Sequence, residues 1–142
     1  MAKTIYTAEA TVTGGREHGH GVTSDGVLDV QLRAPTDEQE TGTNPEQLFA
    51  VGYAACFEGA LGVVGRRERV DLGEVSIDST VSLVSTDDRG YTVAVGLDVT
   101  LPGVDDPERA KAIVAGAHQV CPYSNATRGN VDVTLVANGQ PV

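Results

Sequence analysis

Two cysteines, Cys56 and Cys121, are the side chains of this sequence best suited to chemistry. A thiolate is a strong nucleophile, and it oxidises reversibly to a sulfenic acid or, with a second cysteine, to a disulfide. Two cysteines are too few for the disulfide framework of a small secreted protein, and in an intracellular protein they favour a transient catalytic disulfide. Free cysteine is also a common small core residue, and the spacing alone does not show that the two thiols meet.

Cys56 lies in the middle of an apolar segment, which would raise the pKa of its thiol and make it inert unless a cation lies close by. Arg16, which follows a Gly-Gly pair, is the candidate cation, because a guanidinium stays charged when it is partly buried. Glu46 is the candidate carboxylate to hold that arginine in a bidentate pair. Each has a plainer interpretation: a solvated loop arginine, and a carboxylate that is favourable in the first turn of a helix.

Glu46 and Cys56 fall on the same predicted helix, where about 15 Å would separate them at about 1.5 Å per residue. One arginine would have difficulty contacting both from a single helix. We therefore expect that, if Arg16 contacts both, the site is assembled across a dimer, with the cysteine and the glutamate supplied by different chains.

The segment that contains Cys56 is predicted to be a long helix. Asn44 suits the N-cap, Pro45 the first helical position and Gln47 the partner position of a capping box. The stretch LFAVGYAACFEGALGVVG is apolar on nearly every face, which predicts a helix buried all round. Because one small subunit cannot easily cover such a helix, we expect a homodimer. Glu58 and several glycines argue against a membrane span.

The remaining elements read mainly as strands with period-two alternation. Cys121 opens the segment CPYSNATRG, which is typical of a loop. Alternatively, Cys121-Pro122 opens a helical turn, whose dipole could activate Cys121 in place of Cys56. A second helix should begin at Asp105 or Asp106, with Pro107 in its first turn. Alternation gives bounds for five of the six predicted strands: residues 6–12, 28–32, 75–83, 91–101 and 131–135. The order βββαββαβ with hairpin-length connections predicts a single α+β domain over residues 1–142 with antiparallel sheets.

Composition excludes several classes of protein. With 20 acidic and 10 basic residues the net charge is −10, which disfavours nucleic acid and anionic membranes as partners. The N-terminus has no apolar core of signal-peptide length, which predicts a cytoplasmic protein. Glu17, His18 and His20 form only a weak zinc pattern, and no Gly-rich phosphate loop follows a strand. We expect no bound metal or cofactor.

Three motifs carry a family resemblance: TGGRE near the N-terminus, GTNPEQLFAVGYAACFEGAL around Cys56, and CPYSNATRGNVDV from Cys121. Together they resemble the organic hydroperoxide resistance branch of the OsmC/Ohr superfamily, over most of the chain. The resemblance implies an intertwined homodimer in which antiparallel sheets wrap around buried central helices.

The same resemblance implies a thiol peroxidase that reduces bulky or fatty-acid hydroperoxides, with dihydrolipoamide or a lipoylated protein as the reductant. Position by position, it implies that Cys56 is the peroxidatic cysteine, Cys121 the resolving cysteine, Arg16 the activating arginine and Glu46 its carboxylate partner.

Two other functions fit the same residues. The protein could bind small apolar ligands without catalysis, using two packed cysteines. It could also be a redox sensor that signals through a Cys56–Cys121 disulfide. Loss of turnover on replacement of Cys56 would exclude the first, and rapid multiple turnover with a lipoyl dithiol would exclude the second.

Overall fold

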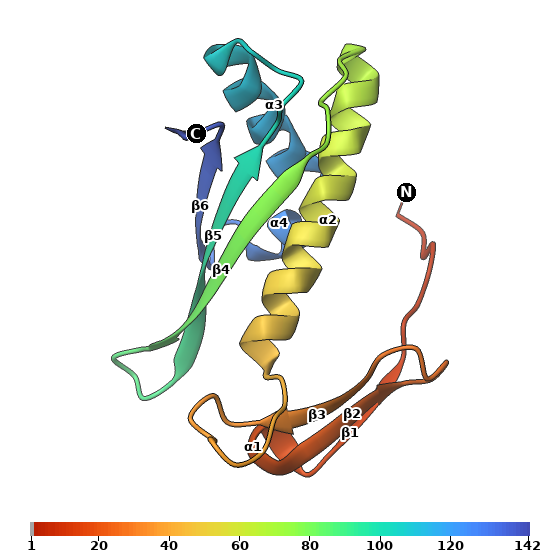
Figure 1. Ribbon diagram of the computed structural model, residues 1–142, viewed down its shortest axis with the longest axis vertical. Helices are drawn as coiled ribbons and strands as arrows, with labels where there is room; N and C mark the ends of the chain where they lie inside the picture. The colour runs from red at the N-terminus through yellow and green to blue at the C-terminus, as the bar shows by residue number, and fades with distance from the viewer. Residues whose placement is uncertain (1) are drawn as a thin grey trace. The chain divides into compact units, whose positions relative to one another are not determined.

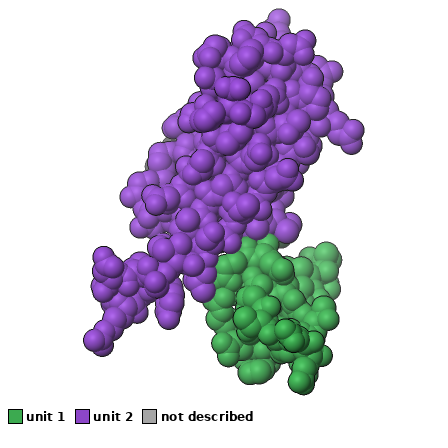
Figure 2. All heavy atoms as spheres, turned by 60° about the vertical axis from the view of Figure 1, so that its left-hand side comes forward, with its two compact units in different colours: residues 1–48 green, residues 49–142 purple. Residues whose placement is uncertain are grey.

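The computed structural model describes residues 2–142, and the chain divides after Leu48 into two compact units. Figure 2 colours residues 1–48 green and residues 49–142 purple. Both units are built from helices and strands, so the predicted α+β class is confirmed. The division into one or two folding domains is a separate question, and the single domain stays a prediction.

The first unit is a three-stranded antiparallel sheet in the order β1-β2-β3, with strands β1 (Ala10–Thr13), β2 (Gly19–Thr23) and β3 (Asp29–Arg33). The predicted first strand over residues 6–12 begins too early, because Ala10 pairs with Thr23, the last residue of β2. Beyond that pair the Ser24 N–H still donates to the Glu9 carbonyl at 2.9 Å, but the chain then turns toward β3, and residues 2–9 form no strand.

The turn between β1 and β2 contains the one-turn helix α1 (Gly15–His18), which carries Arg16. Gly14 and Gly15 have φ angles of 78° and 75°, in the left-handed region that favours glycine. A Cβ atom at Gly14 would lie 2.7 Å from the carbonyl oxygen of His18. The Gly-Gly pair is therefore what allows the chain to reverse so tightly and present Arg16.

Helix α2 (Pro45–Glu68) follows, and it begins as predicted. The Gln47 N–H donates to Oδ1 of Asn44 at 2.9 Å, which makes Asn44 the N-cap. The predicted capping box does not form, because the Gln47 side-chain oxygen accepts from the Thr43 hydroxyl at 2.8 Å instead. The helix is thus capped by one side chain rather than by a reciprocal pair.

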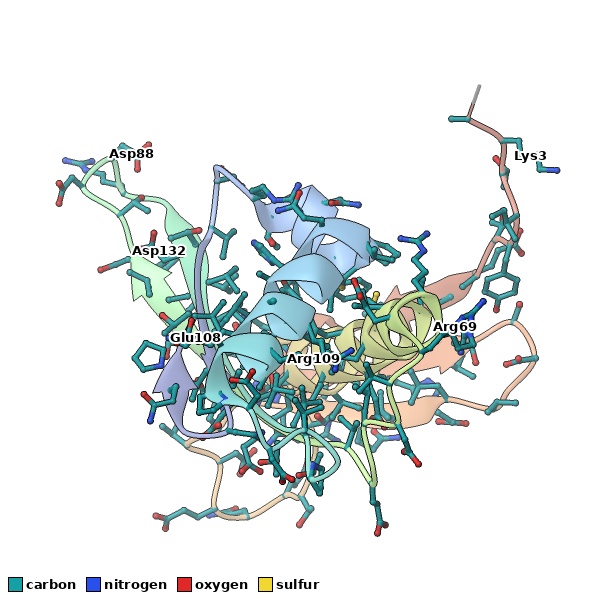
Figure 3. All side chains as sticks on the ribbon, turned by 90° about the horizontal axis from the view of Figure 1, so that it is seen from above. Lys3, Arg69, Asp88, Glu108, Arg109 and Asp132 are labelled. Atoms are coloured by element: carbon teal, nitrogen blue, oxygen red, sulfur yellow. The ribbon has the colours of Figure 1, made fainter. Side chains whose placement is uncertain are left out.

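The second unit has a four-stranded sheet in the order β4-β5-β6-β7. Its strands are β4 (Ser76–Ser85), β5 (Tyr91–Thr100), β6 (Asp132–Ala137) and β7 (Gln140–Pro141). The predicted β4–β5 hairpin is confirmed, with Asp88 in its turn (Figure 3). The prediction that all pairing is antiparallel is wrong for β5 and β6, which run parallel. A helical crossover, α3 (Pro107–Val120) and α4 (Pro122–Thr127), returns the chain to the same end of the sheet.

Helices α2 and α3 pack on one face of this sheet and bury the core of the second unit (Figure 1). The predicted start of the second helix is confirmed, since Asp106 is the N-cap of α3. One face of α3 is buried, through Ala110, Ile113, Val114 and Ala117. Alternate residues of β5 complete the core from the sheet: Val95, Leu97 and Val99. This core fixes α2 against the crossover that carries Cys121.

Helix α2 is not buried on every face in the single chain, as expected if one subunit cannot cover it, and the burial of its remaining face stays a prediction. Val51 is 72% exposed, and Ala55 and Gly59, at the same helical spacing, are exposed as well. By length and composition α2 would also suit a membrane span. However, Tyr53 and Phe57 are fully buried in the protein core, as expected for the central helix of a globular unit.

The Asn44 cap generates the first prediction. Asn44→Ala removes the side chain that accepts from the Gln47 N–H, and we expect the free energy of unfolding to fall by about 1 kcal/mol. Chemical denaturation measures this difference. Asn130→Ala, at an exposed residue with no side-chain hydrogen bond within residues 2–142, is the control and should leave stability unchanged. Equal loss in both variants would contradict the assignment of the cap.

Candidate active site

The two cysteines, far apart in the sequence, are brought together in the second unit. Cys56 lies half-buried in the middle of α2, and Cys121 is fully buried between α3 and α4. The Cys121 thiol donates to the sulfur of Cys56 at 3.5 Å, and both cysteines are free thiols. Since a disulfide bond measures about 2.0 Å, a shift of about 1.5 Å would join the two sulfurs.

Cys121 is held by the junction of two helices. Its N–H donates to the Ala117 carbonyl at 2.8 Å and so ends α3, and its own carbonyl accepts from the Asn125 N–H at 2.9 Å and so begins α4. The interpretation of this segment as a loop is therefore wrong in its first half, and the alternative that Cys121-Pro122 opens a helical turn is confirmed. Pro122 occupies the first helical position, where its missing N–H costs nothing and its fixed φ angle favours a helix.

The environment of Cys56 opposes ionisation. Burial is the main cause that raises the pKa of its thiol above the ordinary value, and the neighbouring Cys121 raises it further. A hydrogen bond from the Tyr123 backbone N–H to the sulfur acts in the opposite direction. The α4 turn that follows Cys121 therefore directs an amide at Cys56. A thiolate at neutral pH would need a further positive charge.

Three aromatic rings from the two elements that hold the thiols pack against one another: Phe49 and Tyr53 from α2, and Tyr123 from α4. Their centroids lie 5.6–6.0 Å apart in tilted or edge-to-face contacts. Tyr123 packs over Gly52, where a Cβ atom would come within 3.1 Å of its hydroxyl. Sequence reasoning missed Tyr123, whose signal was its position two residues after Cys121.

Arg16 and Glu46 form an ion pair in the first unit. Nη2 of Arg16 donates to both carboxylate oxygens of Glu46, at 2.9 and 2.7 Å. This hydrogen bond is the main cause that lowers the pKa of the Glu46 carboxyl, so the carboxylate stays charged in neutral solution. Within residues 2–142, Nε and Nη1 of Arg16 have no hydrogen-bond partner. The glutamate thus orients the arginine while it leaves most donors of the guanidinium free.

The four predicted site residues therefore form two pairs, the ion pair in the first unit and the thiol pair in the second. Sequence reasoning proposed that Glu46 holds Arg16, and the structure shows that contact. The action of Arg16 on Cys56, and the chemical roles of all four residues, stay predictions.

His20, which is close to Arg16 in the sequence, is paired with a carboxylate. Nε2 of His20 lies 2.6 Å from Oδ1 of Asp29 across the β2–β3 pair. In the described part of the chain, no group of three histidine, cysteine, aspartate or glutamate side chains is placed to hold a metal ion.

Fold and site together define a class of protein: an α+β chain whose long central helix places one thiol against a second at the start of a short helix. The family described as OsmC-like protein matches residues 35–136. The organic hydroperoxide resistance protein of Xanthomonas axonopodis pv. citri is 53% identical over 137 residues, 94% of each chain. The crystal structure of OhrB of Bacillus subtilis has a TM-score of 0.88 at 46% identity, covering 94% of this chain and 98% of that one.

A second solved structure gives the same result. The organic hydroperoxide resistance protein of Elizabethkingia anophelis, with thiocyanate bound, has a TM-score of 0.89 at 42% identity and covers 96% of this chain and 99% of that one. The chain belongs to the OsmC family, in its organic hydroperoxide resistance branch.

The close approach of the two sulfurs generates the second prediction. A mild thiol oxidant such as diamide should convert wild-type protein to a Cys56–Cys121 disulfide within one chain, because only about 1.5 Å separates contact from bonding. Mass spectrometry of the non-reduced protein measures the product. Cys121→Ser should give adducts or dimers linked through Cys56 instead. Intermolecular disulfides as the main wild-type product would contradict the prediction.

Proposed function

We propose that this protein is a cysteine-based peroxidase that reduces organic hydroperoxides, of fatty-acid or bulky alkyl type, to alcohols. The observation that carries the proposal is the pair of free thiols, with sulfurs 3.5 Å apart, in a chain of the organic hydroperoxide resistance branch. The aromatic side chains beside the thiols favour an apolar substrate over hydrogen peroxide.

In the proposed reaction the Cys56 thiolate attacks the outer oxygen of the hydroperoxide. The O–O bond breaks, the alkoxide takes a proton and leaves as an alcohol, and Cys56 becomes a sulfenic acid. The Cys121 thiolate then attacks the Cys56 sulfur, the S–O bond breaks, and the departing hydroxide takes a proton to form water. The disulfide protects Cys56 from further oxidation until a dithiol reduces it.

We assign the activation of Cys56 to Arg16. Burial and Cys121 hold the pKa of Cys56 above its usual value, and among the described residues one amide hydrogen bond alone lowers it. A guanidinium near the sulfur would favour the thiolate and polarise the hydroperoxide. Arg16 suits this role because Glu46 orients it through a single nitrogen and leaves Nε and Nη1 free within residues 2–142.

We further propose an intertwined homodimer. The exposed α2 face around Val51, Ala55 and Gly59 is apolar and lies on the central helix, which favours burial against a second copy. On this proposal the Arg16–Glu46 pair of one chain serves Cys56 of the other. We infer a cytoplasmic location, with dihydrolipoamide or a lipoylated protein as the dithiol reductant and no bound cofactor.

The third prediction tests the reaction. With dihydrolipoamide as reductant, the wild-type protein should turn over cumene hydroperoxide many times and hydrogen peroxide far more slowly. Cys56→Ser should abolish turnover, because the attacking sulfur is absent. Consumption of the hydroperoxide and oxidation of the dithiol are both measured.

The controls separate the alternatives. Circular dichroism shows whether Cys56→Ser is folded. A folded wild-type protein that binds the hydroperoxide but does not turn it over would favour a ligand-binding protein. A single oxidation event without recycling would favour a redox sensor. Either result would refute the peroxidase.

The fourth prediction concerns Arg16. Because burial raises the pKa of Cys56, removal of the arginine should move the pH at which the thiol becomes reactive to a higher value. The rate of Cys56 alkylation against pH, measured in a Cys121→Ser background, should therefore have a higher midpoint for Arg16→Ala than for the parent. Arg33→Ala, which removes an arginine paired with Glu40, is the matched control. Identical profiles for all three proteins would refute the role of Arg16.

A further inference from the structure

A buried cluster of three hydroxyl groups ties α4 to α2. The Tyr53 hydroxyl lies 2.7 Å from Oγ of Ser124 and 3.2 Å from Oγ1 of Thr127. Tyr53 and Ser124 are fully buried, and Thr127 is 6% exposed. The Thr127 hydroxyl also lies 3.3 Å from the Ser124 carbonyl oxygen, so the three residues satisfy one another.

Because these hydroxyl groups are buried, each depends on the others for its hydrogen bonds. A buried hydroxyl without a partner loses its hydrogen bonds to water and gains nothing in return, so each member depends on the others. Apolar side chains could fill the same space, but they would not impose a direction. Hydrogen bonds are directional, and these fix the position of α4 along and around α2.

The cluster joins the same two elements that carry the thiols. Tyr53 precedes Cys56 by three positions on α2, about one helical turn, and Ser124 follows Cys121 by three positions. The backbone of Cys121 is bonded into α4 through the Asn125 N–H. The position of α4 therefore sets both the distance from Cys121 to Cys56 and the aim of the Tyr123 amide at the Cys56 sulfur.

We propose that Tyr53, Ser124 and Thr127 are positioning residues for the resolution step, holding the Cys121 thiol against Cys56. This rests on the peroxidase function proposed above. Once Cys56 is a sulfenic acid, two reactions compete for it. Cys121 attacks its sulfur, forming the S–S bond and releasing water, or a second hydroperoxide oxidises it to a sulfinic acid and leaves as an alcohol. The hydroxyl cluster favours the first reaction.

The first test measures this competition. Tyr53→Phe removes one hydroxyl and keeps the ring that packs against Phe49 and Tyr123. In protein that is turning over, the hydroperoxide concentration that converts half of Cys56 to sulfinic acid should fall about fivefold, the factor associated with one hydrogen bond. Mass spectrometry measures the sulfinic acid. Tyr91→Phe, at a tyrosine that is 75% exposed, is the matched control and should behave as wild type.

A general structural defect would affect both the oxidation of Cys56 to the sulfenic acid and the later attack of Cys121 on it. Ser124→Ala, which breaks the same Tyr53–Ser124 contact and keeps every aromatic ring, should increase overoxidation as Tyr53→Phe does. In a Cys121→Ser background it should change the rate at which hydroperoxide oxidises Cys56 to the sulfenic acid by much less. A change in that rate as large as the shift in sulfinic acid would overturn the proposal. Thr127→Ser, which keeps a hydroxyl, should resist overoxidation better than Thr127→Val, which does not.

The second test does not depend on peroxidase activity. The equilibrium between the dithiol and the Cys56–Cys121 disulfide in a glutathione buffer reports how closely the two thiols are held. Tyr53→Phe and Ser124→Ala should each lower the equilibrium constant for disulfide formation about fivefold. The double variant should be no worse than Tyr53→Phe alone, because that variant already removes the Tyr53–Ser124 bond. An unchanged constant would overturn the positioning role, whereas failure of hydroperoxide to oxidise Cys56 would overturn the proposed function instead.

Discussion

The contact between the sulfurs of Cys56 and Cys121 depends on the packing of a crossover against a helix. Cys56 is fixed by α2, whose residues Tyr53, Phe57 and Leu61 are immobilised in the core. Cys121 is fixed because it ends α3 and begins α4 in a single residue. The parallel pairing of β5 with β6 requires this crossover, so the topology of the sheet is what returns the chain to α2.

The same packing creates an electrostatic problem. Burial that holds the thiols together also raises the pKa of Cys56, and a buried thiol is a poor nucleophile. The Tyr123 amide offsets part of this cost, and the partly exposed Arg16, oriented by Glu46, has the charge that would offset the rest. In the proposed mechanism, the positioning of the thiols and the activation of Cys56 are thus separate tasks of residues from different parts of the chain.

Much of the architecture could be predicted because its signals are local. Asn44 and Pro45 mark the start of α2, Asp106 and Pro107 mark that of α3, and the alternation in β5 identifies its buried face. The errors lie where local signals are ambiguous. Alternation is similar in parallel and antiparallel strands, and the composition of the segment after Cys121 suits a turn as well as the short helix that forms.

The sequence by itself determined which residues have reactive side chains, where most helices and strands lie, and that Cys56 sits in an apolar helix. It also named Arg16 and Glu46 as a pair. Only the tertiary structure decided that the two thiols touch, that the Tyr123 amide points at Cys56, and that Tyr53 reaches Ser124. The physical reason is that helix caps and alternation depend on near neighbours in the chain. Contacts between distant residues depend on how a whole core packs.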